Sequence, residues 1–125
     1  MKKLPDIIGE AWARRDGPFV LATTSRSGTP NAIYVNSVHV YDDRTIVVAD
    51  NYFDKTRTNI LAGSRGALLF LTKQRLAYQL KGQITYHTSG PVFAAMKQHN
   101  RADLPGVAAA ALHVEEAYCG AERLT

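Results

Sequence analysis

Lys55, Thr56 and Asn59 are the residues whose types and spacing are best suited to chemistry. Asp54 is a common helix-capping residue, and it precedes a short helix that we expect over about residues 55–61. Lys55 and Thr56 then lie in the first turn, and Asn59 lies one turn on, on the same side as Thr56. Their side chains and the free N–H groups of the helix start could converge on one volume that suits a phosphate dianion. On this stretch alone, the pattern is more typical of an ordinary capped helix with solvated basic residues, because cap signals occur in most helices.

Two predicted strands position this helix. Before it, Ile46, Val47 and Val48 form a β-branched apolar run that is typical of a buried strand. After it, Gly63 ends the helix, and residues 67–71 form a second buried run. The local unit is therefore predicted as strand, polar turn, short helix and strand.

Apolar and alternating patterns predict the remaining elements. Further strands are expected at residues 19–24, 31–41, 77–87 and about 109–118, and further helices at residues 4–15 and 92–99. Six strands joined mostly by short turns indicate an antiparallel barrel or sandwich. No linker or internal repeat divides the chain, so we expect one domain over residues 1–125.

Three polar or small residues interrupt the predicted strands. In the strand over residues 31–41, alternation places Tyr34, Asn36 and Val38 on one face. Asn36 and Ser37 break the β-favouring pattern, either as edge or bulge residues or as hydrogen-bonding partners of a ligand. Gly82 lies inside the strand over residues 77–87, where a bulge or the close approach of another backbone is expected.

Composition excludes several classes of protein. The net charge is +4 and the pI is about 9.4, but the basic residues are scattered, so we expect no nucleic-acid partner. No apolar run approaches the length of a membrane span, and the N-terminus lacks the apolar centre of a secretory signal. A single cysteine, Cys119, allows no internal disulfide and agrees with a cytoplasmic protein.

Common motifs of catalytic and metal sites are also missing. The four histidines have no metal-binding spacing, and no paired cysteines accompany them, so no metal site is expected from local motifs. A metal site assembled from residues distant in the sequence stays open. The chain has no P-loop, no GxGxxG fingerprint and no GxSxG elbow.

The order of these segments resembles the pyridoxamine 5′-phosphate oxidase-like, FMN-binding split-barrel superfamily, and within it the small FMN-binding proteins. The first three strands of that family are similar to FVLATTSRSGTPNAIYVNSVHVYDDRTIVVAD, and its phosphate-binding helix is similar to FDKTRTNILAGSRGALLFL. Its long strand and following helix are similar to QLKGQITYHTSGPVF, and its last strand to ALHVEEAY. The resemblance covers almost the whole chain from Phe19 onward.

The resemblance implies a mainly β fold, a six-stranded antiparallel Greek-key split β-barrel, and a homodimer with FMN at the interface. Lys55 and Thr56 would bind the flavin phosphate and Asn59 would support them. The resemblance also places Asn36 and Ser37 near the flavin ring or the ribityl chain. The polar edge of the ring would receive backbone groups from Val47, Val48, Ala49 and Asp50. The flavin would also be approached by Gln79 and Gly82, from the same chain or from its partner. Larger relatives carry substrate-binding residues in a longer C-terminal region, so vitamin B6 oxidation is not expected.

Three functions follow as hypotheses. The first is an FMN-dependent oxidoreductase of the flavin reductase or oxidase type, or an electron-transfer flavoprotein, with a small-molecule or protein redox partner. The second is a flavin-binding module without turnover that stores flavin or senses redox state. The third is a split barrel that binds another ligand, such as haem or a deazaflavin.

Overall fold

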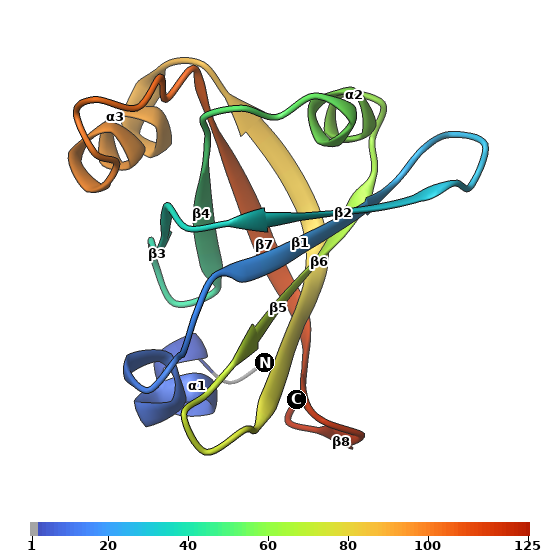
Figure 1. The fold of residues 1–125 in the computed structure, drawn as a ribbon, viewed down its shortest axis with the longest axis vertical. Helices are drawn as coiled ribbons and strands as arrows, with labels where there is room; N and C mark the ends of the chain where they lie inside the picture. The colour runs from blue at the N-terminus through green and yellow to red at the C-terminus, as the bar shows by residue number, and fades with distance from the viewer. Residues whose placement is uncertain (1–2) are drawn as a thin grey trace.

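A curled antiparallel sheet dominates the computed structural model, which describes residues 3–125 (Figure 1). Three helices accompany the strands of this region. In chain order the elements are α1 (Leu4–Ala13), β1 (Phe19–Thr24), β2 (Pro30–Val35), β3 (Val38–Val40), β4 (Thr45–Asp50), α2 (Lys55–Leu61), β5 (Arg65–Leu71), β6 (Ala77–His87), α3 (Gly90–His99), β7 (Ala108–Cys119) and β8 (Glu122–Arg123). None of the helices within this region is long and apolar enough to cross a lipid bilayer.

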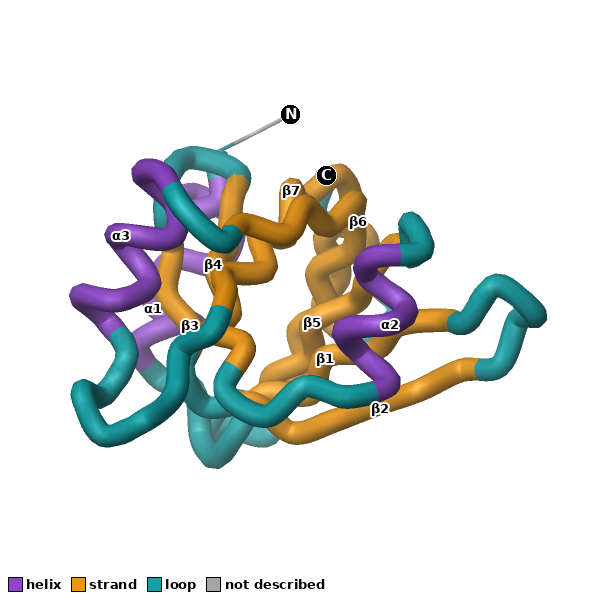
Figure 2. The backbone as a smooth tube through the Cα atoms, turned by 90° about the horizontal axis from the view of Figure 1, so that it is seen from above, coloured by secondary structure: helices purple, strands orange, loops and turns teal. Residues whose placement is uncertain are grey.

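The strands run in the order β2-β1-β5-β6-β7-β4-β3, and β8 pairs with β7. Every named pair is antiparallel. Figure 2 shows the sheet curving from β4 and β7 through β6 and β5 to β1 and β2. The predicted antiparallel split barrel is therefore confirmed, although the described part of the chain has eight strands where six were expected.

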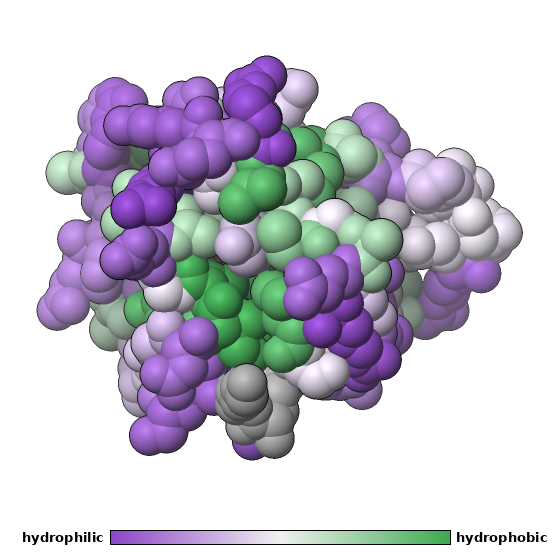
Figure 3. All heavy atoms as spheres, turned by 90° about the horizontal axis from the view of Figure 1, so that it is seen from below, coloured by the Kyte–Doolittle hydropathy of each residue, from purple (hydrophilic) through white to green (hydrophobic). Residues whose placement is uncertain are grey.

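Helices cover both ends of the curled sheet (Figure 1). At one end α1 buries Leu4 and Ile8, and Trp12 packs against Phe19 and Phe70 with ring centroids 5.1 and 5.4 Å away. Figure 3 shows that hydrophobic side chains remain at the surface across the middle of this end. At the other end α2 turns one face toward β1, β2 and β6.

The alanine-rich strand β7 lies between β6 and β4, and its first five residues, 108–112, are buried on both faces of the sheet. Ala110 and Leu112 face the main core, whereas Ala109 and Ala111 face Met96 of α3. Small side chains on the second face let the helix approach the strand closely. This double burial confirms a strand here, although the run of alanines alone favours a helix.

The expected long strand over residues 31–41 is broken into β2 and β3. The N–H of Val38 donates to the carbonyl oxygen of Asn36 at 3.1 Å, which makes a tight turn between the two strands. Val35 and Val38 both pack against the main core, although continuous alternation assigned them to opposite faces. That assignment was wrong because residues 36 and 37 leave the regular pleat and shift its phase.

Gly82 marks a bulge in β6, as the sequence predicts. The register between β6 and β7 shifts between Lys81 and Gly82. A Cβ atom at Gly82 would overlap the carbonyl oxygen of His113 on β7. Glycine is therefore required here by the close approach of the neighbouring backbone.

Candidate functional site

A cleft of about 650 Å³ opens where the β2–β3 connection meets the loops that follow β4 and α3. This volume lies within the usual range for small-molecule sites. Its walls come from three segments that are distant in the sequence: Ile33, Tyr34, Val35, Asn36, Ser37 and Val38; then Ala49, Asn51, Tyr52 and Phe53; and finally His99, Arg101 and Leu104. The break between β2 and β3 therefore opens directly into the cleft.

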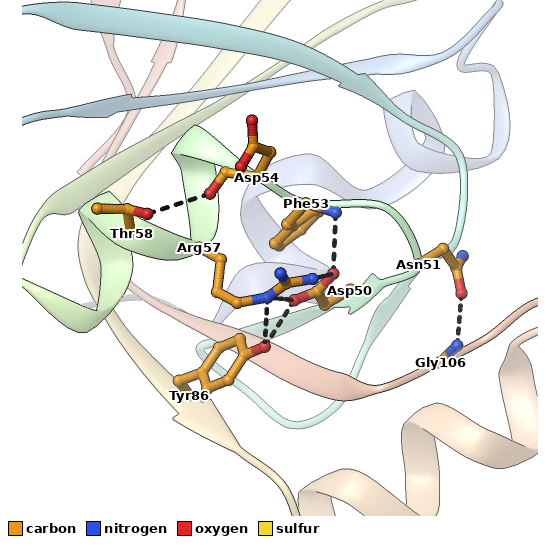
Figure 4. Close-up of polar contacts among 8 residues, drawn as sticks. All are labelled: Asp50, Asn51, Phe53, Asp54, Arg57, Thr58, Tyr86 and Gly106. Carbon is orange, nitrogen blue, oxygen red and sulfur yellow. Dashed lines mark hydrogen bonds and ion pairs between the residues drawn. The ribbon is translucent and has the colours of Figure 1, made fainter.

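Asn51 ties the three walls of the cleft together. Its Nδ2 donates to Ser37 Oγ at 3.3 Å and to Asn100 Oδ1 at 3.1 Å. In return Asn100 Nδ2 donates to Asn51 Oδ1 at 2.8 Å, and the backbone N–H of Gly106 donates to the same oxygen at 2.9 Å (Figure 4). These contacts hold the α3–β7 loop against the end of β4.

The cleft combines aromatic surface with cationic and amide groups. Tyr34 and Tyr52 are 76% and 77% exposed, so both rings are available to a ligand. Arg101 lies on the opposite wall, where its guanidinium contacts Asp103 at 2.6 Å. A flat, partly apolar ligand would therefore find rings to pack on and, at Arg101, an exposed cation whose present partner is an exposed carboxylate.

His99 connects the cleft to β3. Its ring stacks on the ring of His39 with centroids 3.8 Å apart and planes 7° apart. His39 Nε2 is buried without a hydrogen-bond partner. Burial, and then the charge of the neighbouring His99, lower the pKa of His39 to about 4. His39 is therefore neutral at physiological pH.

Beneath the cleft lies a network of charged and polar side chains centred on Asp50, which is fully buried (Figure 4). Arg57 forms a bidentate ion pair with this carboxylate: its Nε donates to Oδ2 at 2.8 Å, and its Nη2 donates to Oδ1 at 3.0 Å. The hydroxyl of Tyr86 donates to Oδ2 at 2.6 Å, and the N–H of Phe53 donates to Oδ1 at 3.0 Å. The network joins β4, α2 and β6, and so fixes α2 beside the cleft.

These hydrogen bonds change the acid–base behaviour of the partners. The bonds to Asp50, and then the bond to Tyr86, raise the pKa of Arg57. Burial, followed by the bond to Asp50, raises the pKa of Tyr86. Since the charge of Arg57 is paired with Asp50, Arg57 is not free to attract an anion. Sequence reasoning missed this network, although an acid ending a buried strand and an arginine in the next helix are a usable signal.

The three residues that were predicted to bind phosphate lie on two different faces of α2. Lys55 is exposed, with 78% of its side chain accessible, and its Nζ lies 3.8 Å from Asp54 Oδ2. Thr56 and Asn59 lie together on the buried face: Thr56 Oγ1 accepts from Asn31 Nδ2, and Asn59 Nδ2 donates to Thr23 Oγ1, both at 3.0 Å. Asp54 occupies the predicted N-cap position of α2, but its side chain makes no capping bond; its carbonyl oxygen accepts from the N–H and the hydroxyl of Thr58.

The other predicted site residues lie at three different places. Asn36, Ser37 and Ala49 line the cleft, so the structure brings these three together. Val47 and Val48 are buried within β4, between β3 and β7. Gln79 and Gly82 lie on β6 and do not line the cleft of their own chain.

Comparison with known proteins agrees with this architecture. The family described as pyridoxamine 5′-phosphate oxidase matches residues 10–119. An uncharacterised protein of Methanocaldococcus jannaschii is 29% identical over 103 residues, covering 78% of this chain and 69% of the relative.

Solved structures show the same fold. HupZ from Group A Streptococcus is 24% identical, with a TM-score of 0.77 over 98% of this chain and 94% of that chain. An FMN-binding protein from Syntrophomonas wolfei is 18% identical, with a TM-score of 0.75 over 96% and 85% of the two chains. With the family match spanning nearly the whole sequence, the chain belongs to the pyridoxamine 5′-phosphate oxidase family.

Proposed function

We propose that this protein binds FMN in the cleft and acts as an FMN-dependent oxidoreductase or electron-transfer protein. The observation that carries the proposal is the cleft itself. It is lined by Asn36, Ser37 and Ala49, three of the residues that the family resemblance assigns to the flavin, and it opens beside the start of α2. Membership of the family, and the similarity to an FMN-binding protein, support the choice of ligand.

The residues present fit FMN in size and in chemistry. The cleft offers about 650 Å³, aromatic rings at Tyr34 and Tyr52, and the amide of Asn36. The phosphate requires a cation, and Lys55 stands two residues beyond Phe53, which lines the cleft. Lys55 has only a 3.8 Å contact with an exposed carboxylate, so exchanging that contact for a phosphate costs little.

Each part of the cleft has a separate task in this proposal. Lys55 pairs with the phosphate, with Thr56 and Asn59 positioning the helix start through their bonds to β1 and β2. Asn36 and Ser37 hydrogen-bond the polar edge of the ring system or the ribityl chain. The tyrosines exclude water from its apolar part. When bound, FMN supplies the hydride or electron transfer, and the protein supplies position and electrostatics.

A homodimer would complete the site. A shallow apolar groove of about 270 Å³ lies on the outer face of β1, β2 and β5, lined in part by Val20, Leu69 and Leu71. Tyr34 lines both this groove and the cleft. A second copy seated in the groove would therefore close over a ligand in the cleft and could bring its own Gln79 or Gly82 near it. Sedimentation of Leu69→Asp tests this: a dimeric parent and a monomeric variant with weaker FMN binding are expected.

Flavin titration tests the binding proposal. We expect FMN fluorescence to be quenched on addition of the flavin-free protein, and Lys55→Ala to weaken binding by about 1.5–3 kcal/mol, or roughly 10- to 100-fold in Kd. Lys73→Ala is the matched control, because Lys73 is also an exposed lysine and lies in the β5–β6 turn. Unchanged affinity in Lys55→Ala would refute the phosphate contact.

A second measurement separates turnover from storage. The flavin-loaded protein is mixed with NADH or NADPH and an electron acceptor, and consumption of the nucleotide is followed. Sustained consumption supports an oxidoreductase, whereas a loaded protein that is inert with each donor supports flavin storage or sensing. An absorption spectrum with a Soret band in place of flavin bands would instead indicate haem.

A further inference from the structure

A second cluster of chemically competent side chains lies outside the cleft, where β6 and β7 run side by side (Figure 1). Thr85 Oγ1 lies 2.7 Å from His87 Nε2 and 2.8 Å from His113 Nε2. Thr85 stands between Ile84 and Tyr86, which pack against the main core, so it points to the opposite face of the sheet. None of the three clustered residues lines the cleft.

The geometry brings two imidazole nitrogens within reach of a single ion. Because both distances share one oxygen, the two Nε2 atoms are no more than about 5.5 Å apart. A metal bound to both at about 2.0–2.1 Å would need them roughly 3–4 Å apart. His113 is exposed and His87 is half-buried on the face away from the main core, so small rotations of the rings can close this difference without disturbing the core.

The hydrogen bonds of the cluster place one protonated and one unprotonated Nε2 beside Thr85 Oγ1. The hydroxyl of Thr85 has one proton and can donate it to only one imidazole, so the second ring must donate to the oxygen. When that ring moves its proton from Nε2 to Nδ1 through solvent, and the hydroxyl of Thr85 rotates away from the other ring, two neutral rings present their Nε2 lone pairs on one side of the sheet. Asp42 adds negative charge nearby: the N–H of Arg44 is the main cause that lowers the pKa of this carboxyl, and His113 is a weaker one.

We propose that His87 and His113 form a binding site for one divalent transition-metal ion of the Cu²⁺ and Zn²⁺ class, with Thr85 Oγ1 beside it. Imidazole nitrogen is a preferred ligand of these ions. Residues 3–125 contain no group of three or more histidine, cysteine or carboxylate side chains placed to hold a metal. The proposed site therefore supplies two protein nitrogens, and water fills the remaining coordination positions of the ion. An ion held by only two protein ligands exchanges readily with solution.

Equilibrium dialysis of the untagged, chelator-treated protein against Zn²⁺ tests the proposal. We expect one Zn²⁺ per chain, and at least tenfold weaker binding in both His113→Gln and His87→Gln. His99→Gln is the matched control, since His99 is a histidine on α3 that bonds its own helix at Ala95 and should bind Zn²⁺ like the parent. Equal binding in the parent and both cluster variants would overturn the site, and so would loss of binding in His99→Gln.

Nuclear magnetic resonance of the unmodified protein gives an answer that no folding defect can obscure. On addition of Zn²⁺, the ring protons of His87 and His113 should shift together and saturate at one equivalent. The ring of His39 should stay unchanged, because its Nε2 is buried beside His99. Shifts confined to His39 and His99 would overturn the proposal.

Discussion

Replacing Arg57 by methionine tests how strongly the buried network stabilises the fold. The substitution keeps an unbranched apolar stem, removes the guanidinium, and so removes the two bonds of 2.8 and 3.0 Å to Asp50. The carboxylate, which is fully buried in the parent, would keep only its bonds from Tyr86 and from the N–H of Phe53. Leaving a buried charge without its partner costs about 3–5 kcal/mol. Because 37% of the Arg57 side chain is exposed, water can reach the carboxylate, and we expect a loss of about 2–3 kcal/mol.

Urea unfolding measures this loss, with the fluorescence of Trp12, the single tryptophan, as the probe. Lys55→Met is the matched control: it removes a cation two residues away in the same helix, but from an exposed position, so we expect a change within about 0.5 kcal/mol. The double variant Asp50→Asn with Arg57→Met should lose less stability than the sum of its single changes, because no charge is left buried. A loss below about 1 kcal/mol in Arg57→Met, or one equal to that in Lys55→Met, would refute the reasoning.

Three further changes have definite expected results. Gly82→Ala should destabilise the protein by more than about 2 kcal/mol in urea unfolding, because its Cβ meets the backbone of β7, whereas Gly66→Ala meets only a flexible side chain and should cost less. His39 has a pKa of about 4 beside His99, against about 6.5 in an unfolded chain. The unfolded chain therefore binds this proton first, and stability should fall as pH decreases from about 6.5 to about 4; an equal fall in His39→Gln would contradict this. Asn51→Ala should speed amide hydrogen exchange in the loop before β7, and unchanged exchange would exclude the anchoring role of Asn51.

The order of the longer strands and the helices could be predicted because these elements bury recognisable apolar patterns, whereas the exposed two-residue strand β8 has no such pattern. The run at residues 46–48 forms the centre of β4, and Gly82 was correctly predicted as a bulge. The secondary structure of the alanine run in β7 was harder to predict, since helix propensity favours a helix there and burial on both faces favours a strand. Burial decided it: with α3 on one face and the core on the other, only small side chains fit.

The polar networks could not be predicted from local patterns. Asp50, Arg57 and Tyr86 come from three elements, and 29 residues separate the last two. Likewise His87 and His113 are brought together only by the pairing of β6 with β7. Spacing along the chain is informative only for groups within one element, so contacts of this kind depend on the sheet register.

The failed prediction of a single strand over residues 31–41 has the same physical cause as the cleft. A regular strand would have directed Asn36 and Ser37 to opposite faces, one of them into the core, where an amide or hydroxyl without a partner is costly. The chain instead leaves the pleat at these two residues: the carbonyl of Asn36 accepts from Val38, and that of Ser37 accepts from Ala49 at 2.9 Å. The main chain thus stays hydrogen-bonded while both polar side chains line the cleft. Local rules are expected to fail at functional sites, and here the failure itself locates the candidate site.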